Sequence, residues 1–265
     1  MANKIGQSQK SGTVLFKYRS MATSTERGYT LDIFNNHRLY CCAPVLFNDP
    51  FECKSEISFD ARAEVKNSRA IEQLMNKNPG MSKREARKRA PMLWKQLEQE
   101  KGRDFLYWLD NGTGVISFSE INDDILMWSH YAGGHNGLCI EFRCNNNYCV
   151  DFFASILRVH YQKNLPGINF YTTPKEEKLK AFILTKSDHW SYEKEWRIII
   201  PDNTKYIPLP PRVISAIYFG CKISEENRNE ILRCVGLTSE YSNVHLFQAK
   251  QLSSAYGLDF ELINQ

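Results

Sequence analysis

Apolar residues recur along much of the chain with the period of a β-strand. The segments Val14 to Tyr18 and Gly114 to Ser119 are rich in β-formers, and successive side chains of a strand point to opposite faces. Further strands are predicted over residues 38–43, 137–142, 157–161, 196–200, 213–219, 244–248 and 258–263. Strands outnumber helices and do not alternate strictly with them, which predicts an α+β fold with a mixed, mostly antiparallel β core.

Between residues 62 and 110 the apolar period changes to that of a helix. Ile71, Leu74 and Met75 fall at positions i, i+3 and i+4, and Asn78-Pro79-Gly80 separates two such segments. The pattern predicts a helical hairpin inserted into the β core. Other helices are predicted over residues 30–36, 123–131, 174–184 and 224–235.

The chain has 265 residues, 42% of them hydrophobic and 24% charged, as is usual for a globular protein. We expect one α+β domain over residues 1–265 with the hairpin at 62–110 as an insertion. The first thirteen residues lack the apolar stretch of a signal peptide, so we expect a cytoplasmic protein with no membrane role. Its eight cysteines are expected to be reduced core residues, and no Cys-x-x-Cys pair suggests a zinc site.

Basic residues are concentrated in the hairpin. Between Lys83 and Arg103 there are eight basic residues against three acidic ones, although the whole chain carries a formal charge of only +4. Two interpretations stay open: a solvated helix face, or a surface that binds nucleic acid. The candidate nucleic-acid-binding residues are Arg84, Arg87, Lys88 and Arg89.

The segment from Ile125 to Phe142 holds the densest group of residues suited to chemistry. Trp128 and Tyr131 lie three positions apart and can share one face of a helix, and Gly133-Gly134 follows them. His130 and His135 could bind a metal, but neither has a carboxylate or cysteine at a recognised spacing. The alternative is structural: Trp128 as a core residue and the glycines as a helix C-cap.

A second group surrounds two glutamates at the start of an apolar strand. If the backbone were extended there, Glu193 and Glu195 would point to the same face, and their repulsion would raise the pKa of one of them. Two carboxylates with different pKa values can divide acid and base roles between them. The alternative is a charged strand entrance in which the glutamates pair with Lys194 and Arg197.

Polar side chains also follow two other predicted strands. Ser117 and Ser119 share one face of a strand, while Phe118 takes the other. Arg19 closes the first strand, and its guanidinium is suited to binding phosphate or to an ordinary surface position.

The order of five motifs along the chain resembles an uncharacterised bacterial family, domain of unknown function 2971. The motifs are Tyr18-Arg19; Phe47-Asn48-Asp49-Pro50-Phe51-Glu52; Val115-Ile116-Ser117-Phe118-Ser119-Glu120; Met127-Trp128-Ser129-His130-Tyr131-Ala132 with His135 and Gly137; and Tyr192-Glu193-Lys194-Glu195-Trp196-Arg197. This resemblance spans most of the chain but implies no activity.

A looser similarity concerns mechanism. Arg19, Ser117-Phe118-Ser119 and Glu193-Lys194-Glu195 look like the Arg, Ser-Thr-Ser and Glu-x-Glu elements of ADP-ribosyltransferases, with Phe118 in place of the usual threonine. The segment from Trp128 to Glu141 has no clear counterpart in them. The similarity implies a split sheet and an enzyme that cleaves NAD and transfers ADP-ribose.

The same similarity implies roles for individual residues. Glu195 would stabilise the oxocarbenium-like transition state, and Glu193 would prepare the acceptor. Arg19 would hold the phosphates of NAD, and the two serines would position the glutamate and the ribose. Trp128 or Tyr131 would stack on nicotinamide. The full expected cofactor site is Tyr18, Arg19, Ser117, Ser119, Trp128, His130 and Tyr131.

Three hypotheses therefore remain. The first is an ADP-ribosyltransferase-like enzyme with a nucleic acid or protein acceptor, acting as a toxin or in antiviral defence. The second is a module that binds nucleic acid or protein without catalysis. The third is metal-assisted hydrolysis by His130, His135, Glu141 and Glu52.

Overall fold

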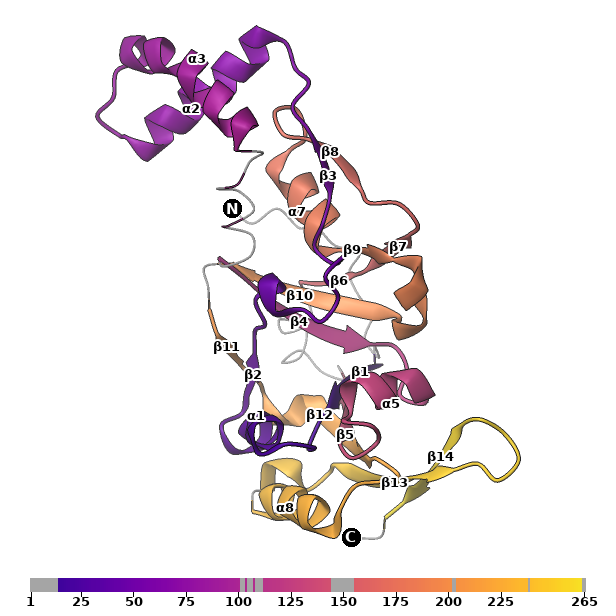
Figure 1. Ribbon diagram of the computed structural model, residues 1–265. Coiled ribbons are helices and arrows are strands. Elements are labelled where there is room, and N and C mark those ends of the chain that lie inside the picture. Colours follow the sequence, from indigo (N-terminus) through magenta and orange to yellow (C-terminus); the bar gives the residue numbers. More distant parts are fainter. Residues whose placement is uncertain are drawn as a thin grey trace. The chain divides into compact units, whose positions relative to one another are not determined.

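The computed structural model describes residues 14–100, 103, 107, 112–143, 155–201, 204–237 and 239–263 (Figure 1). Its internal contacts define two compact units. Unit 1 comprises Met1–Cys42, Gly114–Val159 and His189–Gln265, and unit 2 comprises Ala43–Thr113 and His160–Asp188. The helical hairpin is thus one part of unit 2, which also contains the residues on either side of it and His160–Asp188. The expectation of a single domain stays a prediction.

Unit 1 is built on an eight-stranded sheet in the order β14-β13-β12-β5-β1-β4-β10-β6. The strands are β1 (Val14–Arg19), β4 (Thr113–Ser119), β5 (Leu138–Arg143), β6 (Ile156–Arg158), β10 (Glu195–Pro201), β12 (Ile214–Phe219), β13 (His245–Gln251) and β14 (Leu258–Leu262). β12 and β13 run parallel to each other. β1 is antiparallel to both of its neighbours, β12 is antiparallel to β5, and β14 is antiparallel to β13. The predicted α+β fold with a mixed, mostly antiparallel sheet is confirmed.

The sheet is weakly joined between β1 and β4. Among the described residues, β1 shares six register pairs with β5 but a single one, Phe16 with Ser119, with β4. Beside this pair the Lys17 ammonium donates a hydrogen bond to the carbonyl oxygen of Ser117 over 2.9 Å. A side chain thus supplies a link that a longer strand pairing would otherwise make.

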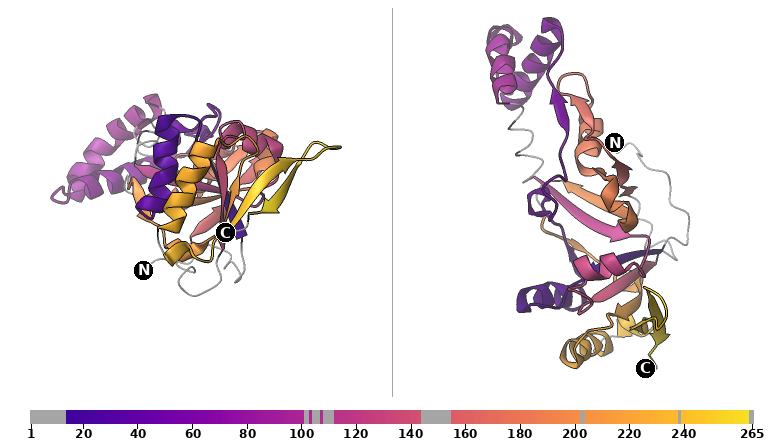
Figure 2. Two further views of the ribbon diagram at one scale, coloured as in Figure 1. Left: turned by 90° about the horizontal axis from the view of Figure 1, so that it is seen from below. Right: turned by 45° about the vertical axis from the view of Figure 1, so that its right-hand side comes forward.

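One face of the sheet packs against α1 (Ser24–Asn35) and α8 (Glu225–Gly236). The two helices lie side by side in Figure 2, and Arg27 of α1 forms an ion pair of 3.1 Å with Glu226 of α8. Ile33 and Ile231 from these helices pack with alternate sheet residues such as Ile140. This side is called the α1 face below.

The other face packs against the short helix α5 (Ile125–Tyr131) and is called the α5 face. Phe16, Cys139 and Tyr218 point to this side and pack with Met127 and Trp128. Asp124 caps α5 by accepting hydrogen bonds from two backbone amides of its first turn. The apolar residues of the central strands therefore serve two separate cores, one on each face.

Unit 1 also contains the antiparallel pair β2 (Arg38–Tyr40) and β11 (Tyr206–Pro208) and the short 3-10 helices η3 (Pro211–Val213) and η4 (Ser239–Tyr241). α1 begins at residue 24 rather than at the predicted residue 30. Thr23 and Glu26 form a capping box, a start signal that the apolar pattern alone did not reveal.

Unit 2 contains the predicted hairpin as α2 (Ala63–Lys77) and α3 (Lys83–Gln99). The helices are linked by an ion pair of 2.6 Å between Lys66 and Glu98, and the Trp94 indole donates to Asn67. Most of the predicted continuation to residue 110 lies outside the described residues. The other elements that the structure describes in unit 2 are η1 (Pro44–Leu46), α7 (Lys175–Ile183) and the parallel pairs β3 (Glu56–Ser58) with β8 (Gly167–Asn169) and β7 (His160–Gln162) with β9 (Thr185–Ser187).

The single strand predicted over residues 157–161 is wrong. Val159 interrupts it, so that β6 pairs with β10 in unit 1 and β7 pairs with β9 in unit 2. The backbone amide of Val159 binds the carbonyl of Glu195, and the next amide, of His160, binds that of Leu184. Across the described residues, no helix combines the length and apolar character needed to cross a membrane.

Candidate functional site

The two glutamates belong to different elements. Glu193 ends the 3-10 helix η2 (Asp188–Glu193), whereas Glu195 opens β10. Lys194 between them has a φ of 44°, in the left-handed region. The two carboxylates were expected on one face only if the backbone were extended from 193 to 195, and this condition is not met, because the alternation rule holds only where every residue is extended.

Glu193 is buried, and its partners come from two other elements. The Tyr131 hydroxyl at the end of α5 donates to its Oε1 over 2.5 Å, and the Ser119 hydroxyl at the end of β4 donates to its backbone carbonyl over 2.6 Å. Glu193 as a whole residue is only 2% exposed to solvent. Three residues that the sequence singled out, Ser119, Tyr131 and Glu193, therefore meet.

Glu195 forms a buried, two-point ion pair with Arg197. The guanidinium Nε and Nη2 donate to the two carboxylate oxygens over 2.7 and 2.8 Å. The neighbouring Ile198 packs into the core on the α1 face, so strand alternation puts Glu195 and Arg197 on the α5 face. The alternative interpretation of a pair with Arg197 is thus correct for Glu195, but the pair is buried rather than on the surface.

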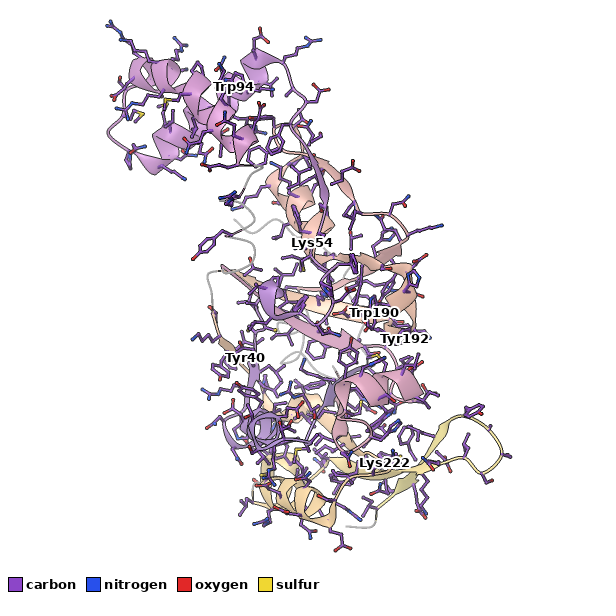
Figure 3. All side chains as sticks on the ribbon, viewed as in Figure 1. Tyr40, Lys54, Trp94, Trp190, Tyr192 and Lys222 are labelled. Atoms are coloured by element: carbon purple, nitrogen blue, oxygen red, sulfur yellow. The ribbon has the colours of Figure 1, made fainter. Side chains whose placement is uncertain are left out.

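Four aromatic side chains form a cluster beside Glu193, here called the aromatic cluster: His130, Tyr131, Trp190 and Tyr192. The ring centroids of His130 and Trp190 are 6.1 Å apart, and those of Trp190 and Tyr192 are 6.1 Å apart. Trp190 and Tyr192 are labelled in Figure 3 and come from η2, next to α5. The cluster is partly exposed, so its rings can contact a planar ligand.

Trp128 and Tyr18 are core residues. The Trp128 ring is fully buried, and its Nε1 donates to the carbonyl of Asn122 over 2.6 Å. Tyr18 packs edge-on against it with centroids 5.4 Å apart, and burial raises the pKa of the Tyr18 hydroxyl. The expectation that Trp128 stacks on nicotinamide is wrong, because its ring has no exposed surface.

Arg19 lies on the opposite side of the sheet from the serines. The pairing of Phe16 with Ser119 puts Ser117 and Ser119 on the α5 face, whereas Arg19, three residues after Phe16, points to the α1 face. Burial lowers the pKa of Arg19, which the charge of Glu26 partly offsets. Its Nε is buried and has no hydrogen-bond partner within the described part of the chain. The structure therefore does not bring Arg19 together with the serines and glutamates.

The residues of the metal hypothesis belong to different units or already contact other side chains. Glu141 accepts hydrogen bonds from Ser215, Tyr218 and Arg143 over 2.6 to 2.8 Å. Burial raises the pKa of Glu141, but these three donors outweigh it and the net pKa is lowered. His135 lies parallel to the Trp128 ring, and among the described residues no three His, Cys, Asp or Glu side chains form a group that could hold a metal ion.

Glu52 belongs to unit 2, where the Lys186 ammonium is 3.5 Å from its carboxylate. The four basic residues of the hairpin are exposed on α3, and Arg89 forms an ion pair of 2.6 Å with Glu85. A surface pocket of about 340 Å³ lies where β13 begins and β14 ends, and neither Glu193 nor Glu195 lines it.

Sequence reasoning found the glutamates, Ser119 and Tyr131, and it offered Arg197 as a possible partner of the glutamates, but it missed the contribution of Trp190 and Tyr192. The pairing with Arg197 could be anticipated because residues 195 and 197 are two positions apart in one strand and share a face. No comparable signal placed η2 against α5, because that contact depends on the tertiary fold.

Residues 127–198 match the family model described as protein of unknown function, DUF2971. The stretch includes residues 127–131 of α5, all of β5 and both glutamates, and it confirms the resemblance to that family. No curated protein and no solved structure matches the chain.

Proposed function

We propose that this chain, which carries the DUF2971 match over residues 127–198, is an ADP-ribosyltransferase-like enzyme that cleaves NAD and transfers ADP-ribose to a nucleic acid or protein. The observation that carries the proposal is the hydrogen bond between Tyr131 and the buried Glu193, at the edge of the aromatic cluster. It supplies a carboxylate beside rings that can stack on a planar, electron-poor ligand.

The residue types suit the reaction. When the bond between the ribose C1′ and nicotinamide breaks, its electron pair leaves with nicotinamide and positive charge develops on the ribose. A carboxylate fixed nearby stabilises that charge. The acceptor then bonds to C1′ and loses its proton to a base. We assign the carboxylate role to Glu193 and the stacking role to Tyr131, His130 and Trp190.

Glu195 takes a different role from the one expected. Both of its oxygens accept hydrogen bonds from Arg197, so its charge is balanced and its position is fixed. We assign the pair to holding the start of β10, and with it Glu193, in place. The short joint between β1 and β4 further supports a sheet divided into two parts, as the similarity to ADP-ribosyltransferases implies.

The test is NAD binding by calorimetry together with nicotinamide release, with water as the acceptor. We expect binding by the wild type and a loss of release of about 100-fold or more in Glu193→Gln, since an electrostatic contact in a transition state is typically worth that much. Glu225→Gln, on the exposed first turn of α8, is the matched control and should keep full activity. A wild type that neither binds NAD nor releases nicotinamide would overturn the proposal.

A second candidate is a binding module without catalysis, favoured by the exposed basic residues of α3. Arg84, Arg87 and Lys88 form no ion pair within the described part of the chain. We expect their replacement by alanine to weaken binding of a nucleic acid and to reduce its salt dependence. The Glu193→Gln variant would bind unchanged in that case.

For either candidate we propose a cytoplasmic location. Six cysteines of the described segments, Cys41, Cys42, Cys53, Cys139, Cys221 and Cys234, are in the reduced thiol form. Free thiols are usual where the compartment is reducing. A role as a toxin or in antiviral defence belongs to the same proposal and would follow from the identity of the acceptor.

A further inference from the structure

Three tyrosine rings form a row on the surface of unit 1, here called the tyrosine row: Tyr29 of α1, Tyr40 of β2 and Tyr206 of β11. Tyr29 and Tyr40 are stacked, with centroids 6.1 Å apart and planes 17° apart. Tyr40 and Tyr206 meet edge to face at 5.6 Å. Tyr40 is labelled in Figure 3, on the flank of the unit that carries β2 and β11.

The local fold holds the row in place. Tyr206 is the direct cross-strand partner of Tyr40 in the β11–β2 pair, so the two rings stand on the same face. Tyr29 projects from α1, which precedes β2 by two residues. The rings come from three elements that the backbone fixes, and they need no rearrangement to present a continuous surface.

The row remains open to solvent. Tyr29 is 52% exposed and Tyr40 is 37% exposed. Large aromatic rings that are stacked with each other yet exposed form a surface that a flat ligand can extend. The surface is thus suited to ligands with aromatic faces.

Positive charge accompanies the rings. The Arg38 guanidinium lies 3.9 Å from the centroid of the Tyr206 ring and is held there by two hydrogen bonds to Asp32. Lys205, next to Tyr206, is exposed and forms no ion pair among the described residues. Since Asp32 is already neutralised by Arg38, the charge left over at the row is that of Lys205.

We propose that the tyrosine row is a binding surface for single-stranded nucleic acid, whose bases extend the stack of Tyr29 and Tyr40 and whose backbone phosphates contact Lys205. Base stacking on aromatic side chains combined with nearby cations is the usual way in which proteins hold unpaired strands. A duplex is a poorer ligand because its bases are already stacked on each other. The inference does not depend on the glutamates or on NAD.

The test is fluorescence anisotropy with labelled 12-nucleotide oligothymidylate and oligouridylate and with a blunt duplex of equal length. We expect the single strands to bind the wild type more tightly than the duplex does. Tyr29→Ala should weaken single-strand binding about 5-fold or more, the least that one lost stack implies. Tyr29→Phe should stay within about twofold of the wild type, because the ring and not the hydroxyl makes the contact.

The matched control is Tyr256→Ala, which removes a fully exposed tyrosine between β13 and β14 and should not change binding. Lys205→Ala should lower the dependence of binding on salt concentration. The proposal is overturned if the wild type binds no single strand. It is equally overturned if Tyr29→Ala binds single strands as tightly as the wild type does. This holds whether or not a variant with both Arg84→Ala and Arg87→Ala, which tests binding by α3, has lost binding.

Discussion

Lys17 is a cation placed where the sheet offers it little compensation. Its ammonium donates to one backbone carbonyl and lies 5.5 Å from the centroid of the Phe118 ring. Burial, followed by the nearby charge of Arg19, lowers the pKa of Lys17 to about 7. The folded protein therefore binds the lysine proton less tightly than the unfolded chain, whose lysine has the ordinary value of 10.5.

This difference has a defined sign. Between about pH 7 and 10.5 the unfolded chain carries more protons at Lys17, so the contribution of this residue to stability increases as the pH rises, and it is smallest below pH 7. We expect the free energy of unfolding of the wild type, relative to Lys17→Met, to increase over that window in urea titrations. Lys205→Met, at an exposed lysine, is the control for the loss of a lysine as such.

The pair of Glu195 and Arg197 is costly to break from one side. Arg197→Met leaves a buried carboxylate without its counter-charge, and we expect a loss of about 3–5 kcal/mol in the free energy of unfolding. The double variant Arg197→Met, Glu195→Leu should recover much of that loss. A double-mutant cycle by urea unfolding measures it, and equal stability of the single and double variants would contradict the expectation.

At the scale of elements, two loops depend on close backbone approach. A Cβ at Gly137, just before β5, would lie 2.0 Å from the carbonyl oxygen of Arg19, and one at Gly220 would lie 2.2 Å from that of His135. Real Cβ atoms do not come so near to a backbone oxygen. The ends of β1, β5 and β12 can therefore meet only if these positions are glycine.

We expect Gly137→Ala to lower the free energy of unfolding by at least about 2 kcal/mol, because backbone must shift to admit the methyl group. Gly236→Ala is the matched control. A Cβ there meets no atom within 4 Å, and alanine in the last turn of α8 should leave stability unchanged or raise it by up to about 1 kcal/mol. Thermal unfolding of both variants separates steric clash from a general effect of the added methyl.

Element types were largely predictable, and the exceptions have physical causes. The sequences of α3 and β12 themselves show the helix period and the strand period, respectively. The strand predicted at 157–161 failed because its halves bond to partners far away in sequence. The same holds for the site: the two glutamates were visible, but the side of the sheet on which Arg19 lies follows from the register between β1 and β4, which no local pattern specifies.

At the scale of the whole molecule, the thiols report on packing. Cys41, Cys53 and Cys139 are buried, whereas Cys42, Cys221 and Cys234 are partly exposed. Burial raises the pKa of Cys41 to about 11, so its reactive thiolate is scarce at neutral pH. We expect a thiol reagent to label the second group well before the first in the native protein, and all of them in urea, as mass spectrometry of peptides would show.

The single register pair between β1 and β4 also bears on how the sheet opens. Neighbouring strands unfold cooperatively because their backbone groups are paired with each other. Between β1 and β4 this pairing is limited to Phe16 with Ser119, together with the hydrogen bond from Lys17. The strands on either side can then lose structure in separate steps. Amide protons of β5 and β12, deep in the larger part, should exchange with solvent more slowly than those of β4, although all three strands lie well inside the same sheet.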